Sequence, residues 1–163
     1  MAYIYPAPGA AGVQSTLKIK VAADDTDTPM SVPALQDVTV NASNDVFTWT
    51  QLDRGSKLQI ATTATNSLAM NLVLDQEIFF GTTGSGGATA PALGIFGAST
   101  DKSLVDFSLY LGDESTGDPG KYIEGQGYVT GLAPTVSADS PVWVSPITIT
   151  VTGDYTVTDT ASF

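Results

Sequence analysis

Apolar and polar residues alternate with a period of two along most of this chain. The alternation is clearest in residues 17–21, 58–61, 68–74, 105–111, 147–152 and 155–158. This pattern predicts β-strands that place one face on a core and the other in water. Valine and threonine, which favour strands, are frequent in the same segments.

Polar segments containing glycine, proline or aspartate separate the expected strands. Asp53 to Ser56 predicts a tight turn, Gly112 to Gly120 a polar hairpin loop, and Gly153-Asp154 a turn between the last two strands. Short strands divided in this way are typical of sandwiches and barrels. We therefore expect a mainly β fold, a two-sheet β-sandwich or barrel with one short flanking α-helix.

The expected helix lies where the alternation stops, after a glycine-rich stretch. The chain continues there as Pro91-Ala-Leu-Gly-Ile-Phe96, and proline is favoured at the first position of a helix. Leu93 and Phe96 would share one face of it. We expect one or two helical turns between Thr89 and Ser99, although the glycine costs about 1 kcal/mol relative to alanine.

The 163 residues fit one domain, with an N-terminal arm before it. Residues 1–15 are rich in Ala, Gly and Pro and cannot bury much surface alone. They form either a disordered tail or an extended arm that docks on a neighbouring subunit through Tyr3, Ile4 and Tyr5. Residues 16–163 are expected to form the β domain.

The composition removes most catalytic chemistry. The chain has no histidine and no cysteine, which excludes Ser-His-Asp and Cys-His arrangements, histidine zinc sites and disulfides. A pair of carboxylates, as in glycosidases, is the mechanism that survives, but nothing in the sequence locates one. We expect no enzyme, no metal and no cofactor.

The acidic balance argues against nucleic-acid binding. Seventeen acids against six basic residues give a formal net charge of -11, which cannot neutralise a phosphate backbone. Many acidic proteins carry such charge only for solubility. No stretch approaches the ~18 apolar residues of a membrane span, and the N-terminus lacks a secretory signal, so we expect no membrane partner.

The order of segments in the second half resembles a known family. Tyr122 to Leu132 contains Val-Thr-Gly-Leu, and Ile147 to Gly153 reads Ile-Thr-Ile-Thr-Val-Thr-Gly. Together with Asp37-Val-Thr-Val and the segments on either side of the expected helix, this succession resembles the major tail tube proteins of long-tailed, siphovirus-type bacteriophages. The resemblance covers roughly residues 35–153 and lies in the succession of segments more than in any one of them.

The resemblance implies a structural subunit of the virion tail, assembled in the host cytoplasm. Such subunits form hexameric rings that stack into a tube, and genomic DNA passes through the channel without specific binding. The implied partners are other copies of the chain, a tape-measure protein, a tail terminator and tail tip proteins. Since an acidic wall repels DNA, we expect Asp106, Glu124 and Asp139 to be among the acids that face the lumen.

Contacts between rings are expected from two segments, the N-terminal arm and residues 41–55. The second is rich in Asn, Asp and aromatic residues. The candidate ring-stacking residues are Tyr3, Ile4, Tyr5, Asp45, Phe47, Trp49 and Arg54.

Other functions for a small β domain stay open at this point. A capsid decoration protein or fibre-type binding module would be a monomer or trimer and would not form long tubes. The tube protein of bacterial type VI secretion shares the tube fold, but its sequence order agrees less well. A carboxylate-pair glycosidase is the enzymatic alternative.

Overall fold

The fold is seen in a computed structural model of the chain, which describes residues 15–22, 29–32, 35–53, 55–74, 79–81, 94–112, 120–139 and 142–163. Residues 1–14 of the expected N-terminal arm lie outside this part, and Ser15 is the first residue of a strand. The elements are β1 (Ser15–Val21), β2 (Met30–Val32), β3 (Leu35–Thr50), β4 (Lys57–Val73), α2 (Gly94–Thr100), β5 (Leu104–Leu111), β6 (Lys121–Leu132) and β7 (Val144–Thr158).

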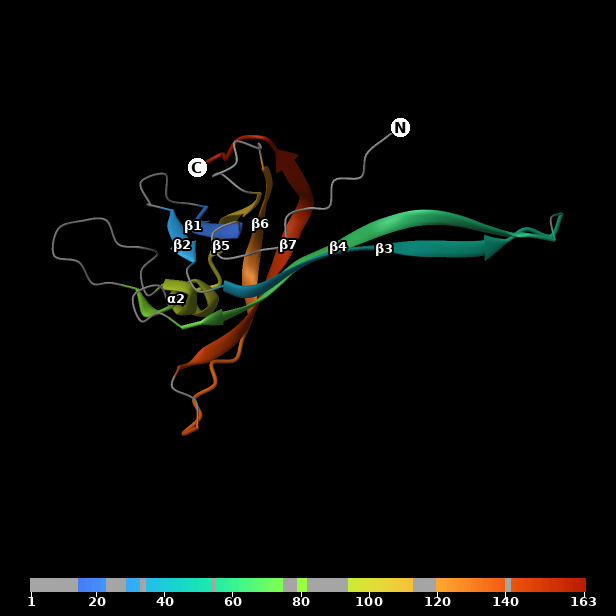
Figure 1. Cartoon of the computed structure of the whole chain (residues 1–163). Coiled ribbons are helices and arrows are strands. Elements are labelled where there is room, and N and C mark those ends of the chain that lie inside the picture. The colour runs from blue at the N-terminus through green and yellow to red at the C-terminus, as the bar shows by residue number, and fades with distance from the viewer. Residues whose placement is uncertain are drawn as a thin grey trace, which may run out of the picture.

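All these strands belong to one antiparallel sheet in the order β2-β1-β5-β6-β7-β4-β3. The expected mainly β fold with one short helix is confirmed. Its division into two sheets is corrected, because β6 and β7 are long enough to hydrogen-bond to both halves without a break. The sheet bends strongly around them (Figure 1).

One hydrophobic cluster joins the two ends of this bent sheet. Leu17 of β1 and Phe107 of β5 belong to the same cluster as Leu68 of β4 and Ile149 of β7, and each is fully buried. Burying such a side chain contributes about 1.5–3 kcal/mol. The curvature of the sheet is therefore held by the packing of its own apolar face.

The helix α2 closes one side of this core. Ile95 and Ala98 are buried in the cluster, and the Ser99 hydroxyl donates to the Val129 carbonyl of β6 at 3.3 Å. The expected helix is thus confirmed at 94–100, while Pro91 and Leu93 lie outside the described residues. Phe96 is 44% exposed and packs beside Phe79 and Phe80.

The segment Gly153-Asp154 does not connect two strands. It lies inside β7, where Glu124 pairs with Thr156 but Gln126 pairs with Thr152, so β7 holds extra residues as a bulge. Gly153 has a φ of 87°, which glycine adopts without strain. The glycine and aspartate that favour a turn also favour a bulge, and the long β6 partner decides between them here.

The hairpin of β3 and β4 extends far beyond the rest of the sheet (Figure 1). The sequence showed 58–61 and 68–74 as separate alternations, whereas the structure joins them in the single strand β4. The expected turn at 53–56 connects β3 to β4, with Arg54 outside the described residues.

Candidate assembly and channel surfaces

The outer half of the β3–β4 hairpin, residues 41–65, is called the β3–β4 arm. Its two strands pair only with each other in the described part of the chain, because β4 pairs with β7 only from Ser67 to Val73. Among the arm's described residues none is buried. A two-stranded hairpin is marginally stable by itself in water, so this arm has the character of a docking element.

One face of the arm carries an apolar cluster, the arm patch, made of Phe47, Trp49, Leu58 and Ile60. Phe47 lies opposite Ile60, and Trp49 lies opposite Leu58. The Phe47 and Trp49 rings stack with centroids 5.9 Å apart and 25° between their planes. Phe47 is 59% and Ile60 55% exposed, so the patch is open to a partner.

The arm patch faces away from the core side of the sheet. Nearer the body, Val38 and Val40 pair with Met70 and Leu68 and face the core. The register shift between Asn44 and Val46 inserts one extra residue on the β4 side. Leu58 and Ile60 consequently lie on the opposite face from Leu68 and Met70, where the chain's own core cannot cover them.

The ring-stacking candidates from the sequence analysis fall into two groups, those that the structure describes and those that lie outside its described residues. Phe47 and Trp49 form half of the arm patch, and Asp45 lies at the bulge, where its carbonyl accepts a hydrogen bond from the Thr62 hydroxyl at 3.2 Å. Sequence analysis missed Leu58 and Ile60 as partners of the aromatic pair. Tyr3, Ile4, Tyr5 and Arg54 lie outside the described residues.

The second surface is the polar face of β1, β5 and β6. Lys20, Asp106 and Gln126 lie side by side on the three strands. The Lys20 ammonium is 3.9 Å from Asp106 Oδ2, and Gln126 Nε2 donates to Asp106 Oδ1 at 2.8 Å. Asp106 is thus held between two strands and its charge is partly balanced by a lysine.

Glu124 occupies the next position on the same face and is almost fully buried, at 7% exposure. The Ser108 hydroxyl donates to its Oε1 at 3.0 Å, as does the Ser162 backbone N–H at 2.8 Å, and the Ser162 hydroxyl donates to Oε2. Burial raises the pKa of Glu124, but the hydrogen bonds from Ser162 and Ser108 outweigh it and hold the pKa below 4.5.

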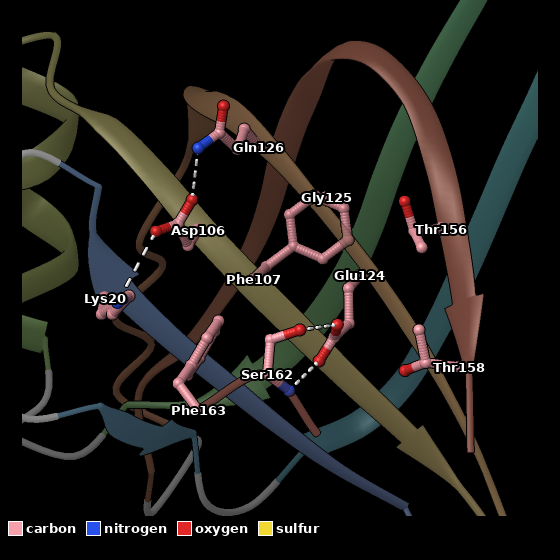
Figure 2. Close-up of a pocket in the computed structure, with 10 residues that line it drawn as sticks. All are labelled: Lys20, Asp106, Phe107, Glu124, Gly125, Gln126, Thr156, Thr158, Ser162 and Phe163. Atoms are coloured by element: carbon pink, nitrogen blue, oxygen red, sulfur yellow. Dashed lines mark hydrogen bonds and ion pairs between the residues drawn. The ribbon is translucent and has the colours of Figure 1, made fainter. Parts of the chain in front are cut away.

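The segment after β7 folds back over this face and closes one side of an open hollow (Figure 2). The Phe163 ring lies 5.1 Å from the Lys20 ammonium, as in a cation–π contact. The hollow has a volume of about 340 Å³. It is lined by Lys20, Asp106, Phe107, Glu124, Gly125, Gln126, Thr156, Thr158, Ser162 and Phe163.

Sequence analysis grouped Asp106, Glu124 and Asp139 as acids of one wall. The structure brings Asp106 and Glu124 together, with Lys18 and Lys20 beside them on β1, so this face is polar but not strongly acidic. Asp139 lies in the exposed connection between β6 and β7. Trp143 follows in the same connection and is 49% exposed, so it does not fill the core.

The described residues offer neither a metal site nor a membrane-spanning helix. Among them, no group of three or more acidic side chains is placed to hold a metal ion. No helix in that part is long and apolar enough to cross a bilayer. The aspartates at 24, 25 and 27 lie outside the described residues.

Comparison by sequence finds no matching protein-family model and no matching curated protein. Comparison by structure finds clear likenesses. The SPP1 tail tube aligns with a TM-score of 0.62 at 12% identity, covering 90% of this chain and 77% of that one. The tail of an empty gene transfer agent particle, solved with C6 symmetry, gives 0.59 at 12% identity, covering 92% and 99%.

A third likeness comes from a contractile machine. The sheath/tube terminator of the extracellular contractile injection system PVC aligns with a TM-score of 0.58 at 14% identity, covering 96% of this chain and 99% of that one. The matches span nearly all of the chain. The bent sheet, its flanking helix and the projecting hairpin together give this chain the phage tail tube fold.

Proposed function

We propose that this chain is the structural subunit of a phage tail tube, located in the virion tail. In the proposal, six copies form a ring, rings stack into a tube, and the channel carries the genome into the host. The observation that carries the proposal is the β3–β4 arm. It exposes an apolar patch and two strand edges that no other described part of the chain covers, on a fold whose likenesses are tail tubes.

The two kinds of contact in a tube suit two features of the sheet. Closure into a ring needs edges that pair with a neighbour, and both outermost strands, β2 and β3, have one edge without a partner in the described sheet. Stacking needs a head-to-tail contact that repeats without closing. The arm fits this role, since its patch includes Phe47 and Trp49 and its bulge includes Asp45.

The N-terminal arm and the turn are proposed as further parts of the stacking contact. Tyr3, Ile4, Tyr5 and Arg54 are the residues concerned. Deleting residues 1–12 should then abolish tube formation and leave the circular dichroism spectrum of the fold unchanged. Tube formation by the truncated chain would remove the N-terminal arm from the contact.

We propose a channel that repels DNA and does not bind it. The net charge of -11 supports this, because a chain with few cations gains no affinity from counterion release. Asp106, Glu124 and Asp139 are the proposed lumen residues. Asp106 and Glu124 already accept hydrogen bonds within the chain. The carboxylate of Asp139, in the exposed connection between β6 and β7, would therefore be the most available of the three to repel DNA. A tube structure with these side chains on the outer wall would discard the assignment.

Electron microscopy of the purified chain tests the function directly. The wild type should form long tubes with six-fold symmetric end views. The double variant Phe47→Ser/Trp49→Ser should stay unassembled while keeping its fold, because only the arm patch is altered. Val136→Ser, at a 60% exposed site outside the arm, is the matched control and should form normal tubes.

Two other outcomes would contradict this proposal in whole or in part. A chain that stays a monomer or forms only trimers under all assembly conditions would contradict the tube and favour a decoration or fibre-type module. Normal tubes from the double variant would keep the tube function and remove the arm patch from the contact. The tape-measure, terminator and tail tip proteins are the further partners in this proposal.

A further inference from the structure

The β3–β4 arm leaves the body at a fork between β4 and β7. The two strands pair from Val73 opposite Val144 to Ser67 opposite Thr150. Beyond that pair β7 continues beside β6, while β4, among the strands that the structure describes, continues beside β3 alone. Main-chain pairing therefore does not fix the direction of the arm past Ser67.

Two side chains bridge the fork where the main-chain pairing ends. Asn66, which is 5% exposed, donates from Nδ2 to the Gly153 carbonyl at 2.8 Å. The Tyr155 hydroxyl approaches the Ser67 carbonyl at 2.7 Å and the Asn41 carbonyl at 2.9 Å. Asn41 and Ser67 are cross-strand partners at the base of the arm, so one hydroxyl contacts both strands.

The β7 bulge makes both bridges possible. Gly153, with its φ of 87°, is the bulge residue whose carbonyl Asn66 reaches. After the bulge, the Tyr155 ring packs edge-on against the buried Phe107 at a centroid distance of 6.3 Å. The tyrosine is thus fixed in the core at its ring and attached to the arm at its hydroxyl.

We propose that Tyr155 is a positioning residue that, with Asn66, sets the angle between the β3–β4 arm and the body. A hydroxyl carries a single proton, so Tyr155 shares it between the two carbonyls, and any swing of the arm must break this contact. A tyrosine hydroxyl is protonated at neutral pH, and burial raises the pKa of Tyr155 further, despite the opposing hydrogen bond to Ser67.

The length of the arm makes this angle important. At about 3.3 Å per residue, about ten residues beyond the fork reach roughly 30 Å, so a tilt of about 10° moves the tip by about 5 Å. A displacement of that size would misplace the arm patch on its partner. This significance of the angle rests on the proposed stacking function, whereas the angle itself can be measured in the unassembled chain.

Pulsed electron paramagnetic resonance on the unassembled chain measures the angle. The chain has no cysteine, so spin labels at Thr48→Cys on the arm and Ser31→Cys on β2 are unique. In the Tyr155→Phe variant, which keeps the ring packing and loses the hydroxyl, we expect the distance distribution to broaden about twofold. Tyr128→Phe, at a 41% exposed tyrosine of β6, should leave it unchanged.

A second variant covers the other bridge. Asn66→Asp keeps the size of the side chain but loses the N–H donor and sets a carboxylate against the Gly153 carbonyl, so the distribution should broaden again. Where tubes form, Tyr155→Phe should raise the critical concentration for assembly about fivefold, the loss expected for one hydrogen bond.

The outcomes separate this inference from the proposed function. Distributions as narrow as the wild type in both variants would overturn the positioning role, even if tubes form normally. A wild-type chain that never forms tubes, but whose arm loosens in Tyr155→Phe, would overturn the tube function and leave the positioning role in place.

Discussion

The body of the sheet and the β3–β4 arm are built from the same kind of alternating sequence, but they reach stability differently. In the body, strands from both ends of the sheet contribute to one buried cluster. In the arm, Phe47, Trp49, Leu58 and Ile60 lie on the face opposite to the core, and none of them is buried. The apolar side chains of the body are covered within the chain, whereas those of the arm patch stay partly or largely exposed.

This difference separates the part of the chain that holds the fold from the part that stays exposed. Edge strands with exposed apolar residues invite association, and proteins usually blunt them. Here the exposed edge is confined to a long arm with a defined bulge and two bridges at its base. The exposed apolar surface of the arm is therefore kept apart from the buried cluster of the body.

The largest effect expected on the isolated chain is a cavity in the body. Ile149→Ala removes a fully buried side chain and should lower the free energy of unfolding by about 2–5 kcal/mol. Chemical denaturation followed by circular dichroism measures this. The matched change in the arm, Ile60→Ala, should cost less than about 0.5 kcal/mol. Equal losses at the two sites would contradict the contrast between body and arm.

A smaller effect is expected from adding a methyl group to a glycine. At Gly127 of β6 a Cβ would lie 2.5 Å from the Thr150 carbonyl oxygen of β7, so Gly127→Ala should cost about 1–3 kcal/mol through strain. At Gly55, beside the tip of the arm, a Cβ would meet nothing within 4 Å. Gly55→Ala should therefore leave the thermal midpoint of unfolding nearly unchanged. A decrease in the midpoint as large as that of Gly127→Ala would mean that the tip of the arm is crowded.

The smallest effect is a pH dependence that belongs to the body. The hydrogen bonds from Ser162 and Ser108 hold the pKa of Glu124 below 4.5, so the carboxylate stabilises the fold above that pH. This contribution is lost as the pH falls through the lower, folded-state pKa. Wild-type stability should fall more steeply on acidification than that of Glu124→Gln, by less than about 1 kcal/mol.

Hydrogen exchange would locate the acid effect. Amides near Ser162 should lose protection first, while the arm amides, which contact neither Glu124 nor Ser162, should not respond to that titration. Identical pH profiles for the wild type and Glu124→Gln would mean that the carboxylate contributes nothing to the fold.

The sequence by itself determined the β class, segments of β1, β4, β5 and β7, and the short helix, because these follow from local periodicity and turn chemistry. It also predicted Phe47 and Trp49 as ring-stacking residues; the structure shows the two rings stacked on the arm patch, and their part in assembly stays a prediction. Alternation also predicts that Asp106 and Glu124 lie on polar faces of their strands, and the strand register places both on the same face of the sheet.

Only the tertiary structure decided which face each apolar pair occupies. Leu58, Ile60, Leu68 and Met70 are all even-numbered residues of β4, and alternation alone would place them on one face. β4 holds one extra residue in its pairing with β3. As a result Leu58 and Ile60 lie on the exposed face, whereas Leu68 and Met70 lie in the core. Likewise, Gly153-Asp154 became a bulge because β6 was there to pair with β7 on both sides of it. Bulges and register arise from contacts between strands distant in sequence, which a local pattern does not encode.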